Sequence, residues 1–109
     1  MVNDETMNES VHTVETESEA RLHAIVHGRV QGVNFRYYTI CTAQQLGLTG
    51  WVANRRDGTV ETVAEGPRAA LSEFHEFLHH GPPSAVVQHV DVKWETPTGT
   101  FQQFRVRYS

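Results

Sequence analysis

The chain has 109 residues and a single cysteine, so it has the length of one domain and cannot form an internal disulfide, which fits a reducing cytosol. It has no run of about 18 apolar residues and no basic-then-apolar start, so we predict neither a membrane span nor a secretory signal. Six of the 13 acidic residues and none of the nine basic residues lie in residues 1–20. The remainder therefore carries a net charge of about +2, which suits small anionic ligands and is too weak to indicate a nucleic-acid-binding surface.

Residues 1–20 are rich in Glu, Ser, Thr and Asn, and their few apolar residues, such as Val11 and Val14, are isolated. Such a segment cannot bury enough apolar surface to offset the entropy lost on ordering. We therefore predict a disordered acidic tail over residues 1–20 and one folded domain over residues 21–109.

Alternation of apolar and polar residues predicts a strand over residues 22–26, and the next periodic segment is a helix that ends near Leu46. Between them lies Gly28–Arg36. Its glycines allow a tight turn that leaves amide N–H groups uncovered, and the start of the helix adds a positive dipole end. Arg36 adds a planar, charged fork that fits phosphate oxygens. The segment suits a phosphoryl group, although on its own it is equally typical of a plain tight turn whose Arg faces water.

The helix after this loop has one apolar stripe at helical spacing. The stripe consists of Phe35, Thr39, Thr42, Ala43 and Leu46. Cys41 falls outside it, so we expect the thiol to be at least partly accessible. We do not expect it to be a nucleophile, since the sequence names no cationic neighbour and no base for it. Gly47 is expected to end the helix.

A β-hairpin is predicted next, with strands over residues 51–55 and 60–64. The Asp57-Gly58 dipeptide between them indicates a type I′ turn, which needs a positive φ at both central residues. This hairpin places Asn54 near the turn end of its strand. Gly66-Pro67 is expected to end the second strand, and Pro67 can occupy the first turn of the following helix.

A second helix is predicted over residues 67–79, and Gly81-Pro82-Pro83 ends it. Its apolar stripe consists of Leu71, Phe74 and Leu78, with Phe77 at the margin. His75 and His79 have a spacing that can bind a metal on a helix. Because no third ligand lies nearby in the sequence, we interpret them as exposed histidines and predict no metal site.

Two further strands complete the chain, one over residues 86–94, where Gln88 interrupts the apolar alternation, and a short one over residues 104–108. The predicted order is β-α-β-β-α-β plus a short terminal strand. This order indicates an α+β, ferredoxin-like split βαβ sandwich, with two helices on one face of a mainly antiparallel sheet.

Two segments of the sequence resemble the signatures of the acylphosphatase family. The first signature is similar to residues 26–36, VHGRVQGVNFR. The second is similar to GWVAN at residues 50–54, followed by DGTVE at residues 57–61 and then Gly66. The two segments occur in the family's order and spacing, and the resemblance covers residues 22–108.

The resemblance implies a small cytosolic hydrolase that cleaves acyl phosphates to a carboxylate and inorganic phosphate without a cofactor. Arg36 would clamp the phosphoryl group, and Asn54 would orient the attacking water. The oxygens would be held by the backbone amides of Arg29, Val30, Gln31, Gly32 and Val33. From the residues alone, bonding of Asn54 to local backbone beside the turn is the favoured interpretation. No obvious general base is present, but the oxygens of a substrate with so good a leaving group can take the proton themselves.

Three functions remain open from the sequence. The first is a monomeric acylphosphatase whose partners are a small acyl phosphate and the phosphate product. The second is a non-catalytic anion-binding or regulatory domain on the same fold. The third is an RNA-binding domain, which ranks last because the expected strands lack paired exposed aromatic residues for base stacking.

Overall fold

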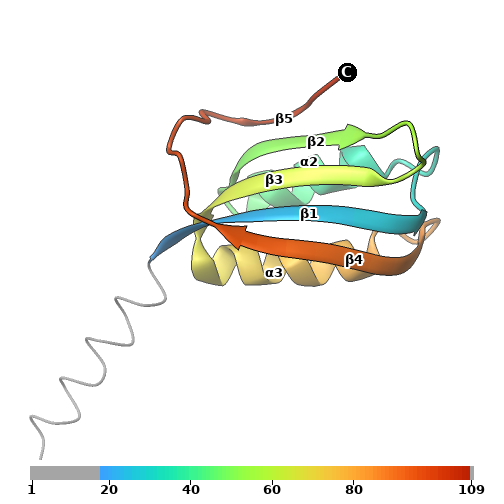
Figure 1. The fold of residues 1–109 in the computed structure, drawn as a ribbon, viewed down its shortest axis with the longest axis horizontal. Coiled ribbons are helices and arrows are strands. Elements are labelled where there is room, and N and C mark those ends of the chain that lie inside the picture. The colour runs from blue at the N-terminus through green and yellow to red at the C-terminus, as the bar shows by residue number, and fades with distance from the viewer. Residues whose placement is uncertain (1–17, 109) are drawn as a thin grey trace, which may run out of the picture.

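The computed structural model describes residues 18–108. Its five strands form one sheet with two helices on one face (Figure 1). The strand order is β4-β1-β3-β2-β5, and within residues 18–108 only β5 runs parallel to its neighbour, β2. The predicted ferredoxin-like α+β architecture is confirmed. In chain order the elements are β1 (Glu19–Arg29), α2 (Phe35–Gln45), β2 (Thr49–Asn54), β3 (Val60–Pro67), α3 (Arg68–His80), β4 (Val86–Glu95) and β5 (Phe104–Val106).

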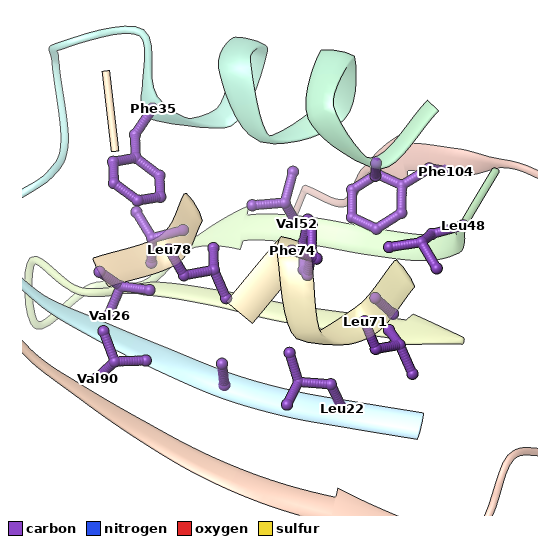
Figure 2. Packing of buried hydrophobic residues seen from close by; sticks show 14 of the residues in the cluster. Leu22, Val26, Phe35, Leu48, Val52, Leu71, Phe74, Leu78, Val90 and Phe104 are labelled. Atoms are coloured by element: carbon purple, nitrogen blue, oxygen red, sulfur yellow. The ribbon is translucent and has the colours of Figure 1, made fainter. Parts of the chain in front are cut away.

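The hydrophobic core lies between the sheet and the two helices, as Figure 2 shows. Burial of each large apolar side chain there stabilises the fold by roughly 1.5–3 kcal/mol. The stripe predicted for α3 is fully buried, whereas in the stripe predicted for α2 Thr42 and Leu46 are only partly buried. Cys41 is partly accessible, as predicted. The buried residues that the helices contribute are Phe35, Thr39, Ala43, Leu71, Phe74 and Leu78.

The first strand begins earlier than predicted and includes two residues of the expected tail. Glu19 pairs with Pro67 and Ala20 with Gly66 in the antiparallel ladder with β3, and Ala20 is buried. The predicted tail boundary at residue 20 is therefore wrong by two residues, because backbone pairing with a long β3 extends the strand past its apolar alternation. Residues 1–17 lie outside the described part of the chain.

The turn between β2 and β3 is not the predicted type I′ turn. Gly58 has a φ of 91°, but Asp57 does not have a positive φ. The Gly58 amide donates to the carbonyl oxygen of Arg55 at 3.2 Å, and the Arg55 amide donates to that of Thr59 at 2.9 Å. This is the longer hairpin connection, in which a right-handed turn is followed by a left-handed glycine. The Asp57 carboxylate stabilises it by accepting hydrogen bonds from the Thr59 amide and hydroxyl at 3.0 and 2.6 Å.

A β-bulge explains why Gln88 interrupts the alternation in β4. The pairing between β1 and β4 shifts after His27, so that Gly28 pairs with Val87 and Gln88 has no partner. A Cβ atom on Gly28 would lie 2.1 Å from the carbonyl oxygen of Val86, so only glycine fits this close approach. Beyond the bulge Val87 packs against the core.

The face of the sheet opposite the helices carries polar side chains that pair across the strands. His23 Nε2 lies 2.6 Å from Glu61 Oε2, and Arg21 Nε donates to Glu95 Oε1 at 3.0 Å. Lys93 lies on this face too, on β4 opposite His23. This open face therefore has a network of polar contacts where the other face has the core.

Candidate functional site

Three connections meet at the end of the sheet where β1 ends (Figure 1). They are residues 30–34 between β1 and α2, residues 55–59 between β2 and β3, and residues 81–85 between α3 and β4. Ser84 Oγ donates a hydrogen bond to the carbonyl oxygen of Val33 at 3.1 Å and so joins the first connection to the third. The loop expected to hold a phosphoryl group is therefore braced by neighbouring loops.

The sign of the backbone φ alternates at the end of the 30–34 connection. Gly32 has a φ of 74° and Asn34 a φ of 64°, whereas Val33 between them has no positive φ. Such alternation turns successive amide N–H groups toward one point and forms an anion-binding concavity. In the described part of the chain, none of the amides from Val30 to Val33 donates a hydrogen bond. The loop thus has both the shape and the unused donors of an anion site.

Hydrophobic residues hold this loop at both ends. Val30 and Phe35, on either side of it, are each only 1% exposed. Figure 2 shows Phe35 pointing from the start of α2 toward Leu78 in the core. A Cβ atom on Gly81 would lie 2.5 Å from the Phe35 ring, so the ring has its place because residue 81 is glycine. The loop is therefore fixed by core packing.

Gln31 connects the loop to the β2–β3 hairpin. Its side-chain Nε2 donates to the carbonyl oxygens of Arg55 at 2.7 Å and Thr59 at 2.9 Å. Arg55 and Thr59 are the first and last residues of the connection that follows Asn54. The contact therefore sets the position of the loop relative to the end of β2. The sequence singled out Gln31 only for its backbone amide.

Arg36 lies in the first turn of α2, where the free amides of the helix end favour an anion. No acidic residue lies in that turn. Among residues 18–108 the guanidinium has no hydrogen bond or ion pair, and its recorded contact is with the Tyr108 ring, whose centroid is 5.9 Å away. The residues around it line an open cavity of about 230 Å³; they are Asn34, Arg36, Tyr37, Ile40, Val106 and Tyr108.

Asn54 is the last residue of β2 and pairs with Val60 in the hairpin. Its side-chain amide makes no hydrogen bond within the described residues, so bonding to local backbone, the alternative left open by the sequence, is not observed. Asn54 lines a second cavity of about 490 Å³. This cavity, called the arginine cavity below, is lined by Trp51, Ala53, Asn54, Arg55, Arg56, Glu61, Arg107 and Tyr108.

The two carboxylates nearest to Asn54 in the hairpin are both engaged. Glu61 is bonded to His23, as described above. The hydroxyl and amide of Thr59 bond to Asp57 and hold the pKa of its carboxyl below the ordinary 3.8. A carboxylate stabilised in its charged form is a weaker proton acceptor. Asp57 therefore does not have the environment of a general base.

The structure brings the predicted site residues to one end of the sheet. Arg29 differs from the other predicted loop residues, because it is the last residue of β1 and pairs with Val86. Tyr108 lines both cavities and so lies between Arg36 and Asn54, a position that the sequence did not indicate. Because β5 pairs in parallel with β2, the carboxyl ends of both strands lie at the same end of the sheet. Knowledge of that pairing would have placed Tyr108 near Asn54.

No metal centre is found among the described residues, where no three His, Cys, Asp or Glu side chains form a group able to hold an ion. The Nε2 atoms of His75 and His79 lie 3.0 Å apart. Burial, and then the charge of His79, lower the pKa of His75 below the ordinary 6.5.

In the part of the chain that the structure covers, neither helix is long and apolar enough to cross a membrane.

Comparison with known proteins gives a consistent result. The acylphosphatase family model matches residues 22–106. An acylphosphatase of Trichormus variabilis is 58% identical over 79 residues, which are 72% of this chain and 78% of the relative. One of Salinibacter ruber is 48% identical over 94 residues, which are 86% of this chain and 99% of the relative.

Solved structures show the same relationship. The acylphosphatase of Bacillus subtilis has a TM-score of 0.79 at 40% identity, over 82% of this chain and 99% of its own. Full-length HypF in its phosphate- and nucleotide-bound form has a TM-score of 0.75 at 25% identity, over 83% of this chain but 12% of its own. With a family model that spans most of its length and near-full-length relatives at such identities, this chain belongs to the acylphosphatase family.

Proposed function

We propose that this chain hydrolyses the carboxyl–phosphate bond of small acyl phosphates, and that the site lies between Arg36 and Asn54. One observation carries the proposal. Three kinds of polar group at one end of the sheet, the amides of residues 30–33 and the two side chains, have no hydrogen-bond or ion-pair partner within residues 18–108. Folded proteins pair most of their polar groups, so a cluster of unpaired donors beside a cavity suits a ligand.

Binding of the phosphoryl group is assigned to the loop and to Arg36. The amides of residues 30–33 donate to its oxygens, and the start of α2 adds the positive end of the helix dipole. The guanidinium of Arg36 can donate two parallel hydrogen bonds to two oxygens. The loop amides are held in place before the substrate arrives, which is the arrangement that stabilises charge in a transition state.

Asn54 is assigned to the attacking water, which its amide can hold through both a donor and an acceptor. The water oxygen forms a bond to phosphorus as the bond from phosphorus to the acyl oxygen breaks, and the carboxylate leaves with the electron pair. The proton of the water passes to a phosphoryl oxygen of the substrate. Positioning and charge stabilisation can therefore supply the rate without a general base.

We further propose that the protein acts as a cytosolic monomer and needs no metal ion. The single partly accessible thiol and the positive balance of the folded part are compatible with this. A site whose charge comes from Arg36 and amides has no need of a metal to bind phosphate.

The test is hydrolysis of benzoyl phosphate by the full chain in EDTA, compared with 4-nitrophenyl phosphate on the same preparation. We expect rapid turnover of the acyl phosphate, no effect of EDTA and little turnover of the monoester, whose leaving group is poorer. Metal-dependent turnover would contradict the proposed chemistry. Phosphate binding by folded protein without any turnover would instead indicate an anion-binding domain of the kind left open by the sequence.

A further inference from the structure

The arginine cavity adjoins the proposed phosphoryl site but is not used by the chemistry described above. Three of its lining residues are Arg55, Arg56 and Arg107, and its one acid is Glu61. The Glu61 carboxylate is already bonded to His23 at 2.6 Å. The cavity is therefore strongly cationic, and the described residues supply no anion that balances its arginines.

Arg107 is held in a defined position at this cavity. Its guanidinium lies over the Trp51 ring, 4.7 Å from the centroid, and its amide donates to the carbonyl oxygen of Val52 at 2.9 Å. Stacking on an aromatic ring uses the flat faces of the guanidinium and leaves its N–H edges free to bind an anion. No acid pairs with Arg107 in residues 18–108.

The two hairpin arginines are almost equally unengaged. Arg55 Nη2 lies 3.8 Å from Asp57 Oδ2, which is long for a hydrogen bond, and that carboxylate already accepts two hydrogen bonds from Thr59. Arg56 is exposed and has no ion pair among the described side chains. Surface charges without partners are ordinary one at a time, but here three face one cavity.

The position of the cavity connects it with the acyl end of a substrate. Asn54, assigned to the attacking water, lines it, and Tyr108 lines both it and the cavity around Arg36. The ladder between β5 and β2 ends at the pair of Val52 with Val106, so the edge of β2 beside Asn54 is not covered by β5. A phosphoryl group at Arg36 can thus have its acyl part directed past this edge toward Arg107.

From this arrangement we infer that the preferred substrates are acyl phosphates with a second anionic group on the acyl part, which Arg56 and Arg107 bind in the arginine cavity. The inference rests on the proposed function, since it names the substrate class of the same site. In this inference Arg36 and the loop bind the phosphoryl group that reacts. The arginine cavity binds the second anionic group, which takes no part in the reaction.

The test uses rigid substrates in which the second anion cannot attack the anhydride. The ratio of kcat/KM for 3- or 4-carboxybenzoyl phosphate to that for the matching neutral carbamoylbenzoyl phosphate is measured on one preparation. We expect at least one carboxylate to be preferred by on the order of tenfold, the size of one charge-assisted hydrogen bond at a partly exposed site. The preference should fall as salt is added, because the charges are partly exposed.

Variants assign the preference to the named residues. Arg56→Gln combined with Arg107→Gln should bring the ratio close to one. Arg56→Lys combined with Arg107→Lys keeps both charges and should retain much of the preference for the carboxylate. Lys93→Gln is the matched control, because it removes one positive charge from β4 at the opposite edge of the same sheet face, and it should leave the ratio unchanged. Arg56→Gln alone, in an exposed turn, should lower the ratio even if the double variant does not fold.

The outcomes separate the two proposals. A wild-type ratio near one with normal benzoyl phosphate turnover overturns this inference and leaves the proposed function intact. A preference that persists in the folded double Gln variant also overturns it. Absence of turnover of every acyl phosphate by folded wild-type protein overturns the proposed function, and the inference with it.

Discussion

The two ends of the sheet differ in whether their polar groups have hydrogen-bond partners within the described residues. At the end where β1 begins, the carboxylate of Glu65 is buried and accepts hydrogen bonds from the Thr98 amide at 2.9 Å, the Gly99 amide at 3.0 Å and the Thr98 hydroxyl at 3.0 Å. Arg21 Nη1 donates to the same carboxylate at 3.1 Å. At the end where β1 finishes, the loop amides and Arg36 have no such acceptor in residues 18–108.

This difference shows how to separate stability from function in one small domain. Donors that meet a buried carboxylate are satisfied within the protein, so their loss should be measured as a loss of folding free energy. Donors left open beside a cavity contribute to binding only when a ligand arrives. Substitutions at the Glu65 end should therefore change melting, and substitutions at the Arg36 end should change turnover.

Arg36→Ala should have the largest effect. It removes the only side-chain cation assigned to the phosphoryl group, so we expect phosphate binding to be lost and kcat/KM to fall by about 10³ or more. Melting should change little, because no ion pair or hydrogen bond of the described chain is lost. The measurements are benzoyl phosphate kinetics and phosphate titration by NMR. Arg36→Lys is the control for charge alone, and activity close to wild type in either variant would contradict the role of the fork.

Asn54→Ala should lower the rate by a factor on the order of 10²–10³, the usual scale for one positioned polar group. Phosphate binding should be largely kept, because the loop and Arg36 remain. Steady-state kinetics and phosphate titration on the same protein measure the two effects. Full activity in this variant would exclude the role in orienting water.

Glu65→Ala should destabilise the fold by about 2–4 kcal/mol, because it leaves several buried donors without an acceptor. Its effect on kcat should be small, since Glu65 lies at the far end of the sheet. Chemical denaturation measures the free energy of unfolding, and kinetics below the transition provide the comparison. A large loss of turnover without loss of stability would break the division between the two ends.

The same carboxylate gives a pH dependence. Burial raises the pKa of Glu65, but the hydrogen bonds from Thr98, Gly99 and Arg21 outweigh it and hold the pKa below the ordinary 4.5. Its contribution is therefore complete above the unfolded pKa and is lost as the pH falls through the lower, folded value. Glu65→Gln should be less stable than wild type at neutral pH and should lose less stability in acid. Equal acid sensitivity of the two proteins would exclude this linkage.

Asn34→Val should destabilise by about 1 kcal/mol, because a β-branched residue is poorly accommodated at a φ of 64°. Asn34→Gly should be neutral or slightly stabilising by comparison, since glycine adopts this conformation freely. Thermal melting of the pair measures the strain held at the site end. Equal melting temperatures for the two variants would show that the conformation of residue 34 is not strained.

Cys41→Ser should have the smallest effect, with turnover close to that of wild type. Cys41 lies on α2 beside Tyr37, and the hydrogen bond between their side chains raises the pKa of Tyr37. Neither residue belongs to the proposed chemistry. A folded but inactive Cys41→Ser protein would overturn this view of the thiol.

The sequence predicted what depends on local patterns. Alternation in β1, the stripe of α3, most of the stripe of α2 and the order of elements are properties of short segments, whereas the close approaches that require glycine at 28 and 81 were not predicted. The turn at Asp57-Gly58 was wrong because the dipeptide also fits a longer connection. Long-range pairing was out of reach: no local pattern states that Thr98 and Gly99 bind Glu65, or that β5 pairs with β2 and places Tyr108 between Arg36 and Asn54.

The side chain of Gln31 has a consequence for how the site meets its substrate. Because one amide bonds to both Arg55 and Thr59, the loop is tied by two hydrogen bonds to the hairpin that carries Asn54. Few dihedral angles then remain to be ordered on binding, so little conformational entropy is lost when the phosphoryl group arrives. In the proposed mechanism this contact sets the separation between the phosphoryl group and the attacking water, and an error of about 1 Å there can cost about a hundredfold in rate. In this proposal the accuracy of the site depends on a side chain whose hydrogen bonds go to the backbone of the neighbouring hairpin.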